Sequence, residues 1–297
     1  MSLGLRIRVA ARALACLAAV ALSLSLGLSS CVRLPLSGKP TIVVTYSIMG
    51  AVVKDLVGDA FRVVVSIPDG LDPREWQPSA KDIEAIDKAA LVVRNGLGLE
   101  EGMSRALDAA EKAGVKVFTA TDHVALRSVG TEDPHIWTDP VTMRAVADAL
   151  CDEIQGDFRV DLSKRRDELD SRYDELDAEV AAAVAKLPPE RRKLATGHGS
   201  MGYFAQRYGF KLVDAPSLSG RTEASAADLA ALKKILAAED VRVFFAEFGE
   251  DPKVALALSR EAGTKTVLLT THALPKGGGY AEFVRGLAAT VVKGLEP

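Results

Sequence analysis

The chain has 297 residues, of which 48% are hydrophobic and 26% are charged, and its formal net charge is −3 at pH 7. This length allows two lobes with cores of their own, and the composition is ordinary for a globular protein. Because the chain is slightly acidic and carries no basic stripe, we expect no nucleic-acid partner.

The first 30 residues differ from the rest of the chain. They contain three arginines and no acidic residue, and an apolar run follows over residues 13–28. This run is shorter than the roughly 20 residues that span a bilayer as a helix, so it favours an export signal over residues 1–30. It ends in the letters LSSC, which resemble a bacterial lipobox, so Cys31 is predicted to carry lipid and to begin a tether over residues 31–40. A plain signal peptide and an uncleaved anchor are the alternatives.

The other two cysteines carry little information on function. Cys16 lies in the predicted signal, which leaves Cys151 as the only cysteine besides the lipidated one. An intramolecular disulfide is therefore excluded after processing. Cys151 lies inside an apolar helical pattern, and we expect it to be a small buried residue.

Apolar runs and helical patterns alternate from residue 41 onward, and this alternation predicts parallel sheets with helices on their faces. We expect two α/β lobes, over residues 41–160 and 190–297. Predicted strands of the first lobe cover 41–46, 62–67, 90–94 and 115–119, with helices over 48–57, 79–87 and 100–113. Predicted strands of the second lobe cover 193–196, 210–214, 241–246 and 266–269, with helices over 224–238, 252–261 and 280–295.

A long helix is predicted between the lobes, within residues 161–189. Ser163 is the predicted N-cap, and the pair of prolines after Leu187 ends the helix. Apolar residues recur along it at spacings of three and four, which gives it one apolar face. About 25 residues at 1.5 Å each make a rod of roughly 37 Å, long enough to pack along both lobes. An exposed helix with charge pairs on its surface is the alternative.

Three of the four histidines lie at turns or after predicted strands, where open α/β sheets place ligand sites. His135 lies in the segment DPHIWTDP, residues 133–140, whose two prolines bracket a rigid turn. His198 follows the strand over 193–196 between two glycines, and His272 follows the run that ends at Thr271. Neutral imidazoles that converge from separate elements suit zinc or another borderline metal. His123 has no such setting, and we expect it to be a surface residue.

The chain beyond the signal resembles the solute-binding proteins of zinc and manganese ABC importers, the TroA-like class, over nearly its whole length. The segment 133–140 is similar to the second-ligand motif of that family, and His198 with the following GYF is similar to the third. The segments NGLGLE, residues 95–100, and EAS, residues 223–225, match landmarks that are not ligands. The resemblance implies two α/β lobes, each with a small parallel sheet flanked by helices, joined by one long rigid helix.

Two positions depart from the family pattern. The first-ligand motif, normally Asp-Pro-His, contains Arg74 in place of the histidine, and an arginine has no lone pair for a metal. The charge of Arg74 near a dication is unfavourable unless it pairs with Glu75, Asp72 or another carboxylate. His272 aligns with the family's fourth ligand, which is usually an aspartate.

The resemblance therefore implies a metal site made of His135, His198 and His272, with Arg74 lining it. The fourth position is open to water, to Glu247, or to Glu75 if its loop shifts, and Glu247 is equally compatible with orienting a histidine. Three imidazoles favour Zn²⁺ as the transported ligand and make Mn²⁺ less favoured.

The predicted function is extracytoplasmic capture of a divalent transition metal and its delivery to an ABC permease with its ATPase. The protein is expected to be a monomer on the outer face of the cell membrane, held there by lipid on Cys31.

Three other functions are weighed against this one. Arg74 beside histidines could bind an anion or a chelated metal complex instead of a bare cation. Three histidines with an open position also resemble a catalytic zinc site, but neither HExxH nor another hydrolase signature is present, so we expect no enzyme. An adhesin role is known for some lipoproteins of this class, although the sequence has no adhesive repeat.

Overall fold

The computed structural model describes residues 38–129, 131–197, 199–214, 226–247, 260 and 263–296. Residues Pro40–Pro297 cluster into one compact unit. The predicted signal, most of the predicted tether and nearly all of the helix predicted over 252–261 lie outside the described residues. Among the described helices, none is both long and apolar enough to cross a membrane.

The first sheet has four parallel strands in the order β2-β1-β3-β4. The central strand β1 is buried on nearly its whole length, as expected for a parallel sheet that is covered on both faces. The strands are β1 (Thr41–Val44), β2 (Arg62–Val65), β3 (Leu91–Arg94) and β4 (Val117–Thr119). All four lie within strands predicted from the sequence, and each is one to two residues shorter.

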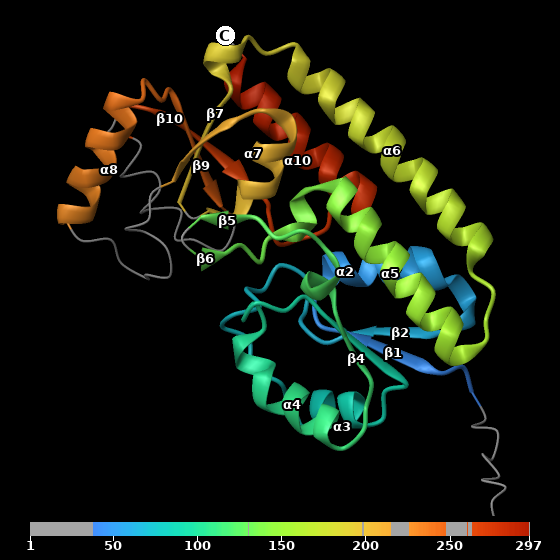
Figure 1. Ribbon diagram of the computed structural model, residues 1–297. Helices are drawn as coiled ribbons and strands as arrows, with labels where there is room; N and C mark the ends of the chain where they lie inside the picture. The colour runs from blue at the N-terminus through green and yellow to red at the C-terminus, as the bar shows by residue number, and fades with distance from the viewer. Residues whose placement is uncertain are drawn as a thin grey trace, which may run out of the picture. The chain divides into compact units, whose positions relative to one another are not determined.

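Helices cover both faces of this sheet, with α3 and α4 on one side and α2 and α5 on the other (Figure 1). The helix predicted over 100–113 begins later, because Glu100 has a non-helical backbone and turns its carboxylate inward to the ends of the strands. The elements are α2 (Ser47–Val57), α3 (Ala80–Asp87), α4 (Ser104–Lys112) and α5 (Pro140–Phe158), with 3-10 turns at Gly58–Ala60, Glu101–Met103, Ala120–His123 and Ile136–Thr138. A short antiparallel hairpin joins β5 (Ser128–Val129) to β6 (Thr131–Glu132). Cys151 is fully buried in α5, as predicted.

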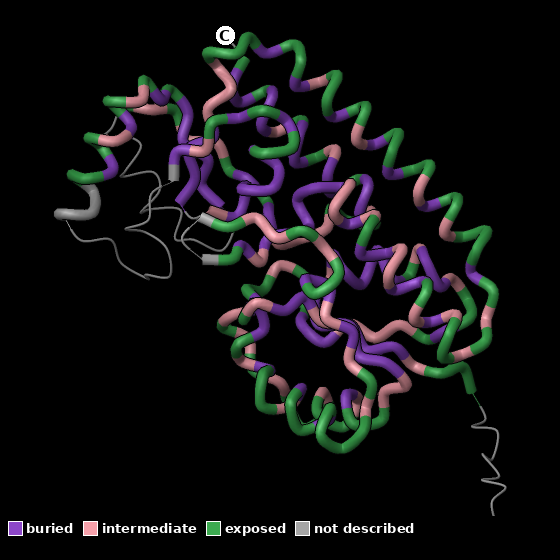
Figure 2. The backbone as a smooth tube through the Cα atoms, in the orientation of Figure 1, coloured by how far each residue is buried: buried purple, intermediate pink, exposed green. Residues whose placement is uncertain are grey.

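The long helix is α6 (Ser163–Ala185), with 23 residues and therefore a length of roughly 35 Å. Its predicted N-cap is wrong by one position: Leu162 caps the helix without a side-chain bond, and Ser163 is its first residue. The carboxylate of Asp161 accepts the Ser163 N–H instead, at 3.0 Å. The predicted apolar face is confirmed, since its five members are buried against α2, α5, α7 and α10 (Figure 2): Leu169, Tyr173, Leu176, Val180 and Val184.

The second sheet is also parallel, in the order β10-β9-β7-β8. Its strands are β7 (Lys193–Thr196), β8 (Lys211–Asp214), β9 (Val243–Glu247) and β10 (Lys265–Leu269), and its helices are α7 (Gly202–Tyr208), α8 (Ala226–Ala238) and α10 (Tyr280–Leu295), with 3-10 turns at Pro189–Arg191 and Gly199–Met201. The start of β9 was predicted two residues too early, because the Val241 N–H bonds to the Leu236 carbonyl at the end of α8.

Alternate residues of β9 pack on opposite faces of this second sheet. Phe244 and Ala246 join a small core with α8, whereas Val243 and Phe245 join the main core with α10. Because side chains alternate between the two faces of a strand, α8 and α10 lie on opposite sides of the sheet (Figure 1). The predicted fold class, two α/β lobes with a parallel sheet each and one long helix, is therefore confirmed.

Candidate metal-binding site

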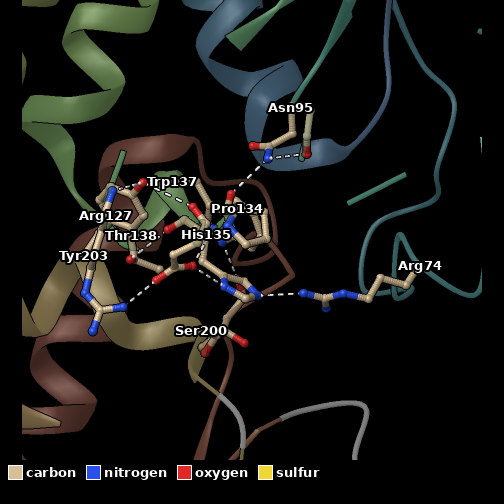
Figure 3. Close-up of polar contacts among 12 residues, drawn as sticks. Arg74, Asn95, Arg127, Pro134, His135, Trp137, Thr138, Ser200 and Tyr203 are labelled. Carbon is tan, nitrogen blue, oxygen red and sulfur yellow. Dashed lines mark hydrogen bonds and ion pairs between the residues drawn. The ribbon is translucent and has the colours of Figure 1, made fainter. Parts of the chain in front are cut away.

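His135 is held in a buried turn between β6 and α5. Its side chain is 7% exposed, and Asp133 accepts hydrogen bonds from it twice. Asp133 Oδ1 lies 3.0 Å from the backbone nitrogen of His135 and 2.7 Å from its Nδ1. Because a carboxylate only accepts, Nδ1 carries the hydrogen, and the lone pair of the ring lies on Nε2. The turn thus presents one defined nitrogen of His135 (Figure 3).

Asp133 is itself fixed by two side chains from other segments. Arg127 Nη1 lies 2.8 Å from Asp133 Oδ2, and the Tyr203 hydroxyl donates to the Asp133 carbonyl at 3.1 Å. Burial acts to raise the pKa of the Asp133 carboxyl, but the hydrogen bonds from His135 and Arg127 outweigh it and hold that pKa below its usual value. Asp133 is therefore ionised and fixes the orientation of the histidine ring.

The ends of the first sheet's strands support the other side of the same turn. Asn95 Nδ2 donates to the Pro134 carbonyl at 2.9 Å, and the Tyr46 hydroxyl donates to Asn95 Oδ1 at 3.1 Å. The carboxylate of Glu100 accepts from the Asn95 N–H and from the Thr45 hydroxyl. Burial raises the pKa of Glu100, and these hydrogen bonds oppose the rise. The segment over residues 95–100 therefore holds the histidine turn in place through Asn95.

Trp137 connects the turn to the loop that carries His272. Its Nε1 donates to the Thr271 carbonyl at 2.8 Å, and its own carbonyl accepts from the Tyr280 hydroxyl at 3.0 Å. The Trp137 ring lies 5.2 Å from the His135 ring and 5.4 Å from the His272 ring, measured between centroids. The two imidazole centroids are 6.3 Å apart. Two of the three predicted ligands thus lie at one place, from segments 137 positions apart in the chain.

Glu247 ends β9 and is 2% exposed. Its Oε2 accepts hydrogen bonds from the hydroxyls of Ser200 and Thr271, each at 2.7 Å. Ser200 follows His198 by two positions and Thr271 precedes His272 by one, so one carboxylate oxygen ties both ligand-bearing segments together. Whether Glu247 binds a metal or orients a histidine stays a prediction.

The remaining predicted site residues are placed as follows. His198 lies outside the described residues, so its role stays a prediction, whereas its neighbours Thr196 and Ser200 are buried. Glu75 is exposed on the loop that follows β2. Within the described ranges, which omit His198, no three His, Cys, Asp or Glu side chains form a metal-binding group. His123 is exposed, as predicted, and stacks on Phe118 with ring centroids 4.4 Å apart.

Arg74 reaches the site from the loop between β2 and α3. Its Nη2 lies 3.0 Å from His135 Nε2, whereas its backbone N–H bonds to the Asp72 carboxylate at 2.9 Å. The guanidinium group therefore contacts an imidazole, and only the backbone N–H of Arg74 is bonded to Asp72, one of the carboxylates that the sequence offered as partners for its charge. Gly102 lets this loop pack closely, because a Cβ there would lie 2.1 Å from the Trp76 carbonyl oxygen.

A second contact of this loop was also missed from the sequence. Asp69 Oδ1 accepts hydrogen bonds from the Ser47 hydroxyl and from the Leu274 N–H, the latter at 3.0 Å. Asp69 thereby links the start of α2 to the segment just after His272. No local sequence pattern predicts a role for Asp69 or Arg127. The partners of Asp69 are Ser47 and Leu274, far along the chain, and Arg127 lies in an irregular segment.

Comparison with known proteins places this chain in a family. The family model of the zinc-uptake complex component A, periplasmic (ZnuA), matches residues 42–294. The zinc-binding protein TroA of Treponema pallidum is 29% identical over 261 residues, which cover 85% of this chain and 83% of that protein. The high-affinity zinc uptake system protein ZnuA of Bacillus subtilis is 30% identical over 273 residues, with 82% and 84% covered.

Manganese binders and solved structures also match. The manganese-binding lipoprotein MntA of Halalkalibacterium halodurans is 24% identical over 264 residues, with 86% of this chain and 88% of that protein covered. The solved structure of the periplasmic zinc-binding protein TroA from Treponema pallidum superposes with a TM-score of 0.79 at 26% identity, over 88% of this chain and all of that chain. Members of this family are solute-binding components of ABC importers outside the cytoplasm, not enzymes. The chain belongs to the ZnuA/TroA family of periplasmic metal-binding solute-binding proteins.

Proposed function

We propose that the protein captures zinc outside the cytoplasm, at a site of His135, His198 and His272, and delivers it to an ABC permease with its ATPase. The observation that carries the proposal is the pairing of His135 and His272 beside Trp137, with ring centroids 6.3 Å apart. Nε2 of His135 carries the lone pair that would bind the metal, because Nδ1 donates its hydrogen to Asp133. A carboxylate that fixes the far nitrogen of a ligand histidine is a usual support of metal sites.

Zinc is favoured over manganese by the donor set. Imidazole nitrogen suits zinc, whereas manganese prefers oxygen donors such as carboxylates. Of the two buried carboxylates next to the proposed ligands, Asp133 is bonded to His135 Nδ1 and Glu247 to the hydroxyls of Ser200 and Thr271. Relatives that bind zinc and relatives that bind manganese both occur, so the metal must be measured.

Metal titration of histidine variants tests the proposal. We expect His135→Ala and His272→Ala each to weaken zinc binding by more than about 100-fold, beyond the 10- to 100-fold cost of losing a group that supports a ligand. His198→Ala should do the same. His123→Ala is the matched control, because His123 is exposed and stacks only on Phe118 among the ring contacts described. Zinc affinity that is unchanged in His135→Ala, or a wild-type protein that prefers manganese, would contradict the zinc site.

A binder of an anion or of a chelated metal is the second candidate, and the contact of Arg74 with His135 is the observation that favours it. A guanidinium group in a ligand site can recognise a carboxylate or phosphate group. Calorimetry of the metal-free protein with zinc, with citrate and with zinc citrate separates the two. Heat with citrate alone, and none with zinc alone, would favour this second function.

Attachment to the membrane by lipid on Cys31 is a further part of the proposal. The short apolar run and the lipobox-like letters before Cys31 support it. Cys31→Ser should move the protein from the membrane fraction to the soluble fraction of cells that express the full chain. Retention of the variant in membranes would favour an uncleaved anchor.

A further inference from the structure

Arg74 and the expected metal compete for the same lone pair. Asp133 fixes the hydrogen of His135 on Nδ1, so Nε2 has one lone pair in the plane of the ring. Arg74 Nη2 lies 3.0 Å from this nitrogen, and a guanidinium group only donates. The lone pair therefore accepts a hydrogen bond from Arg74. The same lone pair cannot bind a metal ion at the same time.

The competition cannot be relieved by loss of a proton from Arg74. Arginine stays protonated in proteins, so the group that faces Nε2 is always a cation. A dication that approached with Arg74 in place would also meet a like charge. Arg74 must therefore withdraw before the metal reaches His135.

The loop of Arg74 allows this withdrawal. Pro73 is buried and anchors the loop, whereas Asp72, Glu75 and Gln77 are exposed and Arg74 is half-buried. In Figure 3 the side chain of Arg74 extends toward His135 from the side opposite Arg127, and only its end meets the ring. Rotation of this long side chain toward solvent frees Nε2 and leaves the turn that holds His135 unchanged.

We propose that Arg74 is an internal cation that takes the place of the transported metal at His135 in the metal-free protein. This inference rests on the proposed function and deepens it, because it assigns to Arg74 control of affinity. Any metal must supply the free energy that displaces Arg74 from His135. At low metal concentration, only a cation with strong affinity for imidazole therefore stays bound. Zinc meets this condition better than manganese.

The first test uses the metal-free protein and does not depend on affinity. In nitrogen-15 spectra, Arg74→Gln should shift the Nε2 resonance of His135, because the bond from the guanidinium group is lost. The guanidinium resonances of Arg74 in the wild type should shift in step with zinc addition. Arg105→Gln is the matched control. It removes the same charge as Arg74→Gln, but at an exposed position on α4. Resonances of His135 that are identical in wild type and Arg74→Gln would overturn the inference.

The second test is the zinc dissociation constant of the same proteins. A hydrogen bond from a charged group is strong enough that its removal should tighten zinc binding about 10-fold or more in Arg74→Gln. Arg74→His should tighten it further, because an imidazole replaces the cation. Arg74→Lys keeps the charge and should stay near the wild type, as should Arg105→Gln. Thermal unfolding of each variant verifies that it is folded.

The zinc dissociation constants test the role of Arg74 separately from the zinc site itself. Tighter binding in Arg74→Gln, or binding by Arg74→Gln alone, supports the inference. Equal dissociation constants overturn it and leave the zinc site standing. Weaker binding in Arg74→Gln overturns it in favour of an anion held by Arg74 together with the metal. Absence of zinc binding in every protein, including Arg74→His, defeats both.

Discussion

The geometry of His135 is set by neighbours that act on opposite ends of its ring. Asp133 fixes Nδ1 at 2.7 Å, and Arg74 lies 3.0 Å from Nε2. Asp133 depends in turn on Arg127, whose side chain is 17% exposed and packs over Gly202 at the start of α7. A substitution that displaces Asp133 should therefore lower the affinity for a metal at His135 Nε2. The substituted residue need not contact the metal itself.

A substitution at Gly202 tests whether metal affinity depends on the pair of Arg127 and Asp133. A Cβ there would lie 2.3 Å from Arg127 Nη1 and 2.4 Å from Asp133 Oδ2, two atoms that form an ion pair. Gly202→Ala should push the pair apart, lower the free energy of unfolding by about 1–3 kcal/mol, and weaken zinc binding by about 10- to 100-fold. Urea unfolding and zinc titration measure the two effects.

Gly286→Ala is the control for this substitution. Gly286 is exposed within α10, and a Cβ there meets nothing within 4 Å. Alanine is the better helix former, so this variant should be more stable by about 0.5–1 kcal/mol, with zinc affinity unchanged. A Gly202→Ala protein that behaves like Gly286→Ala would show that the ion pair over α7 does not support the site.

The long helix α6 forms ion pairs with α2, α5, α7 and α10. Asp177 on α6 accepts a bidentate hydrogen bond from Arg207 on α7, with one N–O distance of 2.8 Å. The bond from Arg207 holds the pKa of the Asp177 carboxyl below its usual value, although partial burial opposes this. The pair joins the long helix to the helix that follows the segment of His198.

The lowered pKa of Asp177 gives a dependence of stability on pH with a defined sign. A carboxyl whose pKa is lower in the folded protein stabilises it above the unfolded pKa of about 4, and the effect is lost as the pH falls through the folded pKa. Asp177→Asn should therefore be less stable than the wild type at pH 6. The difference should shrink below about pH 4, where the wild type also becomes protonated. Urea unfolding from pH 6 to pH 2 measures it, and a difference that does not change with pH would contradict the assignment.

The elements themselves could be predicted from the sequence, because their signals are local. Alternating runs gave all eight strands of the two sheets, and the 3.6-residue period gave the buried face of α6. Errors lie at the ends of the elements, where a single contact sets the boundary. Leu162 and not Ser163 is the N-cap of α6, and the Asp161 carboxylate accepts the Ser163 N–H. The Val241 N–H bonds to the end of α8, so β9 begins later than predicted. Glu100 is not helical because its carboxylate accepts hydrogen bonds from the Asn95 N–H and the Thr45 hydroxyl at the buried ends of the strands.

The site could be predicted only in part, for the same physical reason. The rigid turn of His135 and the strand-end setting of His272 are visible locally. The contact of Arg74 with His135 spans 61 positions and that of Asp69 with Leu274 spans 205, so no window of sequence contains either. Arg74 was recognised as unable to ligate a metal, but its partner became clear only in three dimensions.

At the scale of the whole unit, the site lies where the carboxyl ends of the strands of two parallel sheets meet. Among the described residues, the hydrogen bonds that cross between the two lobes include those of Trp137 to Thr271, Tyr280 to Trp137 and Leu274 to Asp69. Tyr203 adds two more, since its hydroxyl accepts from the Arg127 N–H and donates to the Asp133 carbonyl. The long helix α6 packs on helices of both lobes along its buried face. We infer that capture and release proceed through small movements of loops such as that of Arg74, since a wide opening would break all of these contacts.

The central claim is that one metal ion binds His135 Nε2 after Arg74 has withdrawn. A crystal structure of the zinc-loaded protein, with anomalous data on both sides of the zinc and manganese edges, tests it most directly. We predict one zinc ion bonded to His135, His198 and His272, with the Arg74 guanidinium turned away from Nε2. An ion bound elsewhere, or Arg74 still bonded to Nε2 in the loaded protein, would contradict the account.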